Sequence, residues 1–212
     1  MEVIIFCNNE DHPCISRLKD LSIELTNEGK KCSLVTSKLS DQKGDLCFLV
    51  SCSQIINKNV IGNFKKVFVL HCSDLPHGRG WSPYAWEILN GSDLLTMSLI
   101  EANEKVDTGD IWLQEKIPLN GSELLNEIME KVISSELSLI RKCINNFGQI
   151  IPKRQKGEGV SYFPKRGPEH SELDIHKSIF QQFNLLRIVD NQRFPAFFVI
   201  NGVKYFVKIS RD

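Results

Sequence analysis

The sequence predicts an α/β fold in which helices cover both faces of a doubly wound, mainly parallel sheet. Short apolar runs typical of buried strands recur along the first half of the chain, an amphipathic helical pattern lies between the first two, and turn-forming residues bound them. Strands that alternate with helices favour a parallel sheet, because a parallel connection has to cross over one face of the sheet. A chain of 212 residues is long enough for one such domain, with or without a small appendage.

The elements of the expected core follow in a regular order. They are a strand at 3–7, a helix at 15–28, strands at 32–36, 46–50 and 66–70, a short helix at 86–89, a strand at 95–102 and a long helix at 122–146. Gly29 ends the first helix and Asn90 with Gly91 ends the short one, as such residues commonly do. Ser122 is the expected N-cap of the long helix. The apolar face of that helix is made by Leu125, Ile128, Val132, Leu139 and Cys143.

The chain divides into three expected parts: a core at 1–148, a linker at 149–161 and a small α+β subdomain at 162–212. The linker is rich in Lys, Arg, Gly and Pro, a composition typical of exposed loops. In the last part we expect a helix near 177–189, followed by a hairpin that turns at Asn201 and Gly202, the dipeptide most typical of a two-residue turn.

Composition excludes several classes of protein. The 26 basic residues balance 26 acidic ones, which argues against a broad nucleic-acid surface but allows a small anionic substrate. The seven cysteines include no C-x-x-C pair, so we expect reduced, mostly buried thiols, no disulfide framework and no metal site. The start of the chain lacks a signal-peptide pattern and no apolar stretch is long enough to cross a bilayer, so we expect a cytoplasmic protein without a membrane partner.

Two motifs carry the expected chemistry. Residues 71–83 read H-C-S-D-L-P-H-G-R-G-W-S-P directly after an expected strand, and residues 105–111 read K-V-D-T-G-D-I. Ligands of doubly wound sheets bind at the carboxyl ends of the strands, which is where His71 stands. Taken singly, a histidine at a strand end and a D-T-G turn are ordinary structural features. Gly78 and Gly80 do not have the spacing of a phosphate-binding loop, so a bent active-site loop is the better interpretation.

In their order and separation, the two motifs resemble the active site of the formyltransferases that move a formyl group from N10-formyltetrahydrofolate to an amine. The resemblance implies that His71 is a donor to the formyl oxygen, and that Asp107 sets the charge of His71 and takes part in proton removal, with no metal. Histidine suits this role because it changes charge near neutral pH. The resemblance also implies two sets of binding residues. For the folate donor they are Ser51, Cys52, Gln54, Ile55, Leu75, Pro76, Val106 and Asp110. For the acceptor they are Asn8, Asn9, Asp74, Arg79, Trp81, Ser82, Lys165, Arg166, Asn184, Arg187 and Arg193.

The tail points to a subgroup. It reads Y-x-P-K-R-x-P-E, then I-x-x-x-x-N-L-x-R, then R-x-P-A-F-F-x-x-x-G, and is similar to the end of formyltransferases that act on nucleotide-linked amino sugars, some of the pseudaminic-acid type. This implies formylation of the 4-amino group of a nucleotide-linked 4-amino-4,6-dideoxy sugar, with the last subdomain contributing to the sugar-nucleotide site. Our first choice of acceptor is UDP-4-amino-4,6-dideoxy-N-acetyl-altrosamine, and dTDP-4-amino-4,6-dideoxyglucose is the alternative. A homodimer is one assembly that the resemblance allows.

One residue departs from the family pattern. The family has Asn two residues before the histidine, and its amide helps hold the formyl oxygen, whereas this chain has Val69. Either another donor serves, such as backbone N–H groups near Arg79 or the side chain of Asn8, or the protein is a non-catalytic relative that binds folate or a nucleotide sugar.

Overall fold

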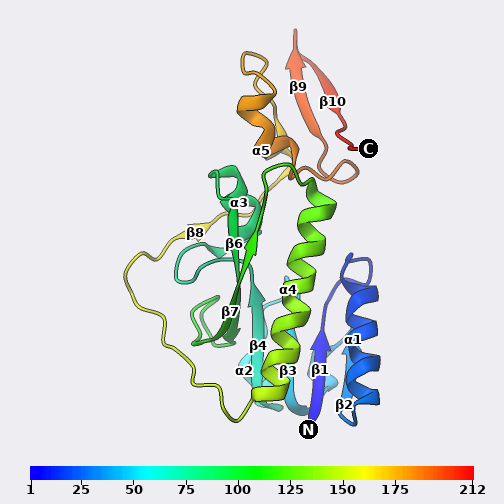
Figure 1. The fold of residues 1–212 in the computed structure, drawn as a ribbon, viewed down its shortest axis with the longest axis vertical. Coiled ribbons are helices and arrows are strands. Elements are labelled where there is room, and N and C mark those ends of the chain that lie inside the picture. Colours follow the sequence, from blue (N-terminus) through cyan, green and yellow to red (C-terminus); the bar gives the residue numbers. More distant parts are fainter.

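A six-stranded sheet forms the centre of the computed structural model, which describes residues 1–212. The strands lie in the order β2-β1-β3-β4-β6-β7 (Figure 1). Their bounds are β1 Glu2–Phe6, β2 Lys31–Val35, β3 Gly44–Leu49, β4 Phe64–His71, β6 Leu94–Glu101 and β7 Ile111–Pro118. The first four strands are parallel to one another, and β6 is antiparallel to both of its neighbours, β4 and β7. The predicted α/β fold with a mainly parallel, doubly wound sheet is confirmed.

Helices cover both faces of this sheet, as its apolar alternation requires. One face of the strands packs against α1 (Ile15–Asn27), α3 (Pro83–Leu89) and α4 (Leu125–Asn146) in the larger core. The opposite face packs against α2 (Lys58–Ile61) and a single 3-10 turn at Leu39–Asp41. Alternate residues of one strand therefore serve different cores: Val3 and Ile5 point to the first, Ile4 and Phe6 to the second.

The beginning of α4 differs from the expectation. Ser122 is not its N-cap: Leu124 occupies that position, and the carboxylate of Glu127 accepts the N–H of Leu124. The hydroxyl and N–H of Ser122 are used instead on the side chain of Asn120. A serine that bonds locally in a turn competes with the capping role, which explains the error.

The C-terminal part extends beyond the end of the sheet, next to the beginning of α4 (Figure 1). The expected helix at 177–189 is wrong in length: a 3-10 turn at Phe180–Gln182 leads into α5, which spans only Phe183–Leu186. Side chains of Gln181 and Gln182 accept backbone N–H groups of Ser178 and Asp174, so polar side chains replace the first helical turns. The hairpin is confirmed, with β9 (Ala196–Ile200) and β10 (Val203–Val207) joined at Asn201 and Gly202, both at positive φ.

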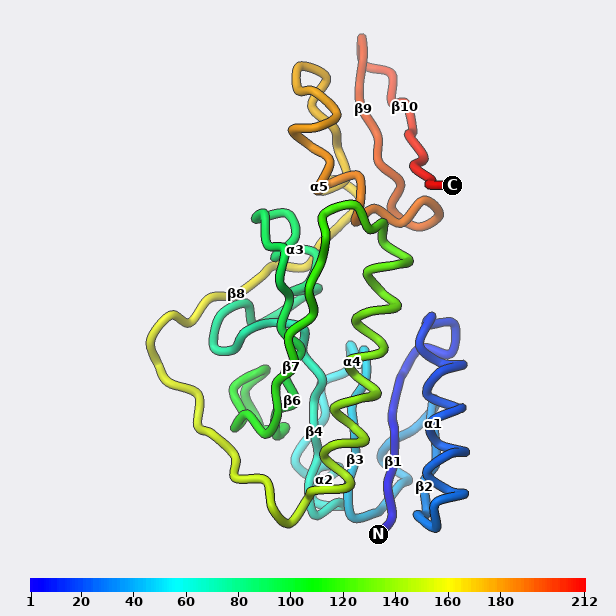
Figure 2. The backbone as a smooth tube through the Cα atoms, viewed as in Figure 1, coloured from blue at the N-terminus to red at the C-terminus, as the bar shows by residue number.

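The segment 149–161 connects the far end of α4 to this part of the molecule. It runs outside the sheet without regular secondary structure (Figure 2). It pairs with β7 at one point, where Lys153 and Ile111 exchange backbone hydrogen bonds. It then forms the two-residue strand β8 (Tyr162–Phe163), which pairs in parallel with β5 (Arg79–Gly80). No helix in the structure has the length and apolar content needed to cross a lipid bilayer.

A buried ion pair joins the C-terminal part to the core. Arg187 donates from Nη2 to the Glu123 carboxylate at 2.8 Å and from Nε to the Glu123 carbonyl at 3.0 Å, and both side chains are less than 5% exposed. The same carboxylate accepts from Lys131 and from the N–H groups of Asn120 and Gly121. Burial disfavours the charge, but the hydrogen bonds from Lys131 and Asn120 outweigh it and lower the pKa of Glu123 to about 2.

We expect Glu123→Gln to lower the free energy of unfolding at neutral pH by about 3 kcal/mol or more, the scale for breaking one side of a buried ion pair. Because the folded-state pKa of Glu123 is depressed, its contribution is present above the unfolded pKa of about 4.3 and is lost as the pH falls toward 2. Urea unfolding at several pH values measures this. The difference between the variant and the parent should shrink on acidification.

The matched control is Glu130→Gln, on the same helix, whose carboxylate is 64% exposed and pairs with Arg17. Exposed pairs contribute about 0–1 kcal/mol, so this variant should unfold almost like the parent. Equal losses in the two variants would contradict the importance given to the Glu123–Arg187 pair.

Candidate active site

His71 is the last residue of β4, at the carboxyl edge of the parallel strands. Its side chain is buried, and both ring nitrogens face oxygen atoms: Nε2 lies 2.9 Å from the Gly78 carbonyl and Nδ1 lies 3.6 Å from Oδ1 of Asp107. A neutral imidazole can donate from only one nitrogen, whereas an imidazolium donates from both. Because the Gly78 carbonyl can only accept a hydrogen bond, Nε2 of His71 is the donor in this contact.

Asp107 is brought to His71 by a strained turn. Its backbone has φ of 55°, in the left-handed region that residues other than glycine rarely adopt, and its carboxylate Oδ2 accepts the N–H of Gly80 at 2.9 Å. The glycine of the D-T-G motif is required by close packing, because a Cβ on Gly109 would overlap the Glu101 carbonyl. Close packing at Gly109 thus holds the turn that carries Asp107 against the end of β6.

The loop between His71 and α3 is held by the strand that follows the linker. Arg79 and Trp81 donate their N–H groups to the carbonyls of Ser161 and Phe163, and Gly78 donates to the Ser161 hydroxyl. Gly80 has φ of 100°, and a Cβ there would overlap the Phe163 carbonyl oxygen. Gly80 therefore permits a close approach of two backbones, whereas a Cβ on Gly78 would overlap the Phe163 ring.

Sequence reasoning missed Gln155, which lies in the segment interpreted as a linker. Its Nε2 donates to the carbonyls of Asp107 and Gly109, at 2.9 and 2.8 Å, and its Oε1 accepts from Nη2 of Arg79 at 2.6 Å. One amide thus joins the Asp107 turn to the loop that follows His71. A single glutamine among charged residues carries no motif that predicts this.

Arg79 is 8% exposed and belongs to this centre rather than to the surface. Besides the bond to Gln155, its Nη1 donates to the Tyr162 hydroxyl, while its Nε is buried without a hydrogen-bond partner. Asp74, also proposed for the acceptor, lies on the same loop and pairs with Lys116 at 2.9 Å.

The residues expected to hold the donor come from three loops. Ser51, Cys52, Gln54 and Ile55 follow β3, and an ion pair between Lys58 and Glu104 brings the start of α2 to the loop that carries Val106 and Asp110. Leu75 and Pro76 lie in the loop after His71, and the bond between them is cis. Ile55 is 81% and Val106 55% exposed, so both neighbouring loops present apolar side chains to solvent.

The residues expected to hold the acceptor do not form one group. Nζ of Lys165 lies 5.1 Å from the centre of the Trp81 ring, and Ser82 follows Trp81 with φ of 47°. Arg166 donates to the carbonyl of His170, and Asn184 lies half-buried in α5.

The remaining acceptor residues bond to other parts of the protein. Arg187 forms an ion pair with Glu123, and Arg193 forms one with Asp190. The side chains of Asn8 and Ser53 bond each other, while Asn9 accepts the N–H of Asp11.

Val69 projects from the same face of β4 as His71, because side chains two apart on a strand point the same way. It packs in the smaller core with Cys52 and Ala102. The backbone donors that could replace the missing amide are occupied: Gly78, Arg79, Gly80 and Trp81 all donate to protein acceptors. The side-chain amide of Asn8 likewise donates to the Ser53 hydroxyl. Either kind of donor would have to exchange its present partner to hold a formyl oxygen, so the replacement of the missing amide stays a prediction.

Residues 8–144 match the formyl transferase family. The chain belongs to this family. Among curated relatives, the methionyl-tRNA formyltransferase of Thermodesulfovibrio yellowstonii is 29% identical over 153 residues, which is 71% of this chain and 49% of the relative. The chain spans about half the length of the curated relatives that it matches.

Solved structures share the fold over the entire chain. A methionyl-tRNA formyltransferase from Clostridium thermocellum has a TM-score of 0.83 at 22% identity, and the match covers 100% of this chain and 94% of the Clostridium chain. HypX from Aquifex aeolicus in complex with tetrahydrofolic acid has a TM-score of 0.82 at 20% identity, over 99% of this chain and 37% of its own. A sugar N-formyltransferase from Shewanella has a TM-score of 0.76 at 19% identity, and the match covers 100% of this chain and 98% of the Shewanella chain.

We expect Gln155→Met to lower kcat for formyl transfer by about a hundredfold with little change in KM, because misplacing a reacting group by about 1 Å has this cost. The methionine keeps the length of the side chain but removes all three hydrogen bonds to the Asp107 turn and Arg79. Gln149→Met, an exposed position in the same segment, is the control. Equal kinetics in the two variants would remove the positioning role.

Proposed function

We propose that this formyl transferase moves a formyl group from N10-formyltetrahydrofolate to the 4-amino group of a nucleotide-linked 4-amino-4,6-dideoxy sugar. The observation that carries the chemistry is the buried pair of His71 and Asp107, each also bonded to the Gly78–Gly80 loop. The first choice of sugar remains UDP-4-amino-4,6-dideoxy-N-acetyl-altrosamine, and the dTDP-linked 4-amino-4,6-dideoxyglucose is the alternative.

His71 is proposed to stabilise the charge that develops on the formyl oxygen when the amine attacks the formyl carbon. Its Nε2–H is occupied by the Gly78 carbonyl, which leaves Nδ1–H for the substrate. The 3.6 Å between Nδ1 and Asp107 is longer than a direct hydrogen bond, so the proton on Nδ1 remains available to the formyl oxygen. A preorganised hydrogen-bond donor in a buried site stabilises a developing oxyanion.

Asp107 is proposed to receive the proton that the attacking amine loses. Its Oδ2 is held by the Gly80 N–H, which leaves Oδ1 on the side of His71. In the complete reaction a new C–N bond forms to the amine, the bond from the formyl carbon to N10 breaks, and the proton lost by the amine is balanced by one taken up at N10. A general acid–base pair of this kind contributes about 100- to 10,000-fold.

The donor is proposed to lie across the ends of β3 and β4. The exposed side chains of Ile55 and Val106 stand on two neighbouring loops and offer apolar surface to a flat pterin ring. The residues present therefore fit a folate, which supplies the activated formyl group. Folate binding at this fold is also consistent with the tetrahydrofolate complex of the Aquifex neighbour.

The acceptor is less closely defined. The stacked Lys165 and Trp81 pair, with Trp81 44% exposed, offers a ring face and a cation to a base and its phosphates. The formal charge of zero and the sugar N-formyltransferase from Shewanella favour a small nucleotide sugar. The methionyl-tRNA formyltransferases among the relatives favour tRNA, which is the competing acceptor.

A second candidate function is binding without catalysis, and Val69 favours it. The usual amide is absent and the N–H groups of the loop at 78–81 already donate to protein acceptors, so these groups are not free to hold a formyl oxygen. In this case folate and the nucleotide sugar would bind but no product would form.

We expect His71→Gln and Asp107→Asn each to lower product formation by about a hundredfold or more while folate still binds, because an oxyanion donor or its charge partner is lost. Single-turnover assays read by mass spectrometry measure the transfer, and fluorescence titration measures folate binding. Near-normal transfer in either variant would remove this mechanism. No transfer by the parent to any acceptor would support the binding function.

The variant Val69→Asn separates an adapted site from an impaired one. In an adapted site the new amide has no partner beside Cys52 and Ala102 and costs about 1–3 kcal/mol, so turnover should be unchanged or reduced. A gain of about a hundredfold, the scale of a restored oxyanion donor, would mean that the natural chain is impaired.

We expect the acceptor to be a nucleotide sugar and not tRNA. Product formation with a panel of UDP- and dTDP-linked amino sugars should exceed that with methionyl-tRNA, and acceptor affinity should depend only weakly on salt, because few phosphates are neutralised. Tight, steeply salt-dependent binding of methionyl-tRNA, followed by its formylation, would replace the sugar proposal with the activity of the curated relatives.

A further inference from the structure

Three potential metal ligands meet where β1 passes into α1. Cys7 follows β1, Cys14 immediately precedes α1, and the intervening turn folds back so that His12 lies beside them. The two sulfur atoms are 4.0 Å apart, Nδ1 of His12 is 2.9 Å from Sγ of Cys14, and all three donor atoms lie within 4.8 Å of one another. The active-site mechanism uses none of these side chains.

The separations fit a tetrahedral metal centre. Zinc–sulfur bonds of about 2.3 Å at tetrahedral angles place two sulfurs about 3.8 Å apart, close to the observed distance. Nδ1 of His12 also accepts the N–H of Cys14 at 3.3 Å, so it would have to give up this hydrogen bond to bind an ion. For Nδ1 of His12 and Sγ of Cys14 to share a zinc ion, their separation would have to lengthen from 2.9 Å to roughly 3.5 Å.

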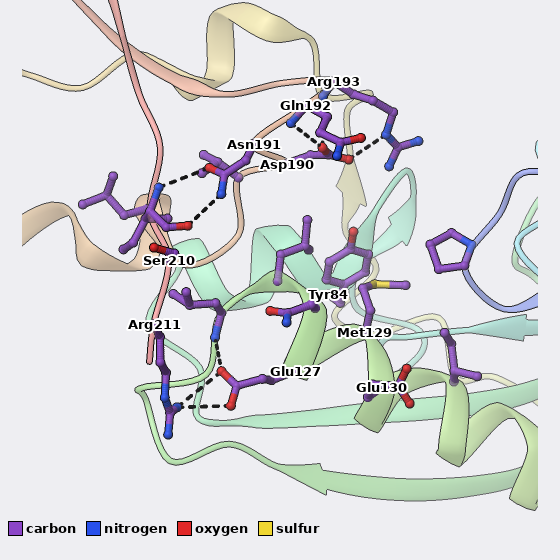
Figure 3. Close-up of a pocket in the computed structure, with 18 of the residues that line it drawn as sticks. Tyr84, Glu127, Met129, Glu130, Asp190, Asn191, Gln192, Arg193, Ser210 and Arg211 are labelled. Carbon is purple, nitrogen blue, oxygen red and sulfur yellow. Dashed lines mark hydrogen bonds and ion pairs between the residues drawn. The ribbon is translucent and has the colours of Figure 1, made fainter.

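A cavity gives access to the cluster. His12 and Pro13 line a cavity of about 720 Å³ between the first turns of α4, the turn at 190–193 and the end of the chain. Figure 3 shows this cavity, with Glu127 and Glu130 of α4 on one side and Asp190 with Arg193 on the other. The two cysteines are fully buried behind it, whereas His12 is partly exposed. An ion can therefore enter on the side of His12.

We propose that Cys7, His12 and Cys14 form a zinc site with three protein ligands and a fourth position open to water from the cavity. Binding joins the end of β1 to the start of α1 and releases the thiol protons. The spacing C-x₄-H-x-C has no C-x-x-C pair, which is why the sequence predicted no metal. This proposal does not depend on the formyl acceptor or on catalysis.

The experiment uses the reduced, chelator-treated full chain titrated with Co²⁺ and then with Zn²⁺. We expect one Co²⁺ per chain, thiolate-to-cobalt charge-transfer absorption with the strong d–d bands of tetrahedral cobalt, and displacement by Zn²⁺. Zinc should also raise the melting temperature, because it binds the folded chain.

Variants assign the ligands. Cys14→Ser should reduce the charge-transfer band, and His12→Gln should weaken binding by more than the roughly 10- to 100-fold that loss of an outer-shell partner costs. His12→Gln keeps the test valid if the buried Cys14→Ser does not fold. Cys143→Ser, a fully buried thiol outside the cluster, is the control and should bind like the parent.

Three results would overturn the proposal. They are a cobalt spectrum without thiolate charge transfer, affinity unchanged in His12→Gln, or equal loss in the Cys143→Ser control. Failure of the parent to bind either metal, while a mild oxidant joins Cys7 to Cys14, would replace the metal site with a redox pair. Formyl transfer is measured separately, so failure of the metal site and failure of the proposed function remain distinguishable.

Discussion

The close approach of two backbones at Gly80 and Phe163 is the constraint on which the rest of the candidate site depends. No side chain fits between the strands β5 and β8, and their hydrogen bonds fix where the loop after His71 can go. In this position the Gly78 carbonyl accepts a hydrogen bond from His71, and the Gly80 N–H donates one to Asp107. The proposed catalytic pair of a parallel sheet is thus positioned by a strand that follows the last helix of the core.

Charge and burial are combined differently at the candidate active site and at the junction between the core and the C-terminal part, where Glu123 meets Arg187. At the candidate active site, Oδ1 of Asp107 and Nδ1 of His71 are buried together 3.6 Å apart, which is beyond the usual distance of a direct hydrogen bond. At the junction, Glu123 and Arg187 are in direct contact with all their neighbours satisfied, which suits a fixed structural role. The carboxylate of Asp107 thus faces the imidazole without a direct hydrogen bond, whereas that of Glu123 is fixed by several.

The sequence predicts the parts of this protein that depend on local patterns. Strands, the main helices, the hairpin at Asn201 and the position of His71 at a strand end follow from periodicity and turn residues. The helix near 177–189 is wrong because Gln181 and Gln182 bond the backbone in place of helical turns. Gln155 could not be predicted, because its partners lie 46 and 48 residues earlier in the chain, on the Asp107 turn. The meeting of His12 with Cys7 and Cys14 depends on a folded turn that spacing alone does not specify.

The path of the 149–161 segment has a consequence for the integrity of the protein. Gln155 stands between exposed basic residues, Arg154 and Lys156, at which trypsin-like proteases cut. After a single cut there, the two fragments would stay associated through the Glu123–Arg187 pair and the β5–β8 strands. The nicked molecule would keep its size and compactness in solution. The hydrogen bonds by which Gln155 holds the Asp107 turn would, however, be weakened. Elution at the expected size from a sizing column would therefore not show that the candidate active site is intact.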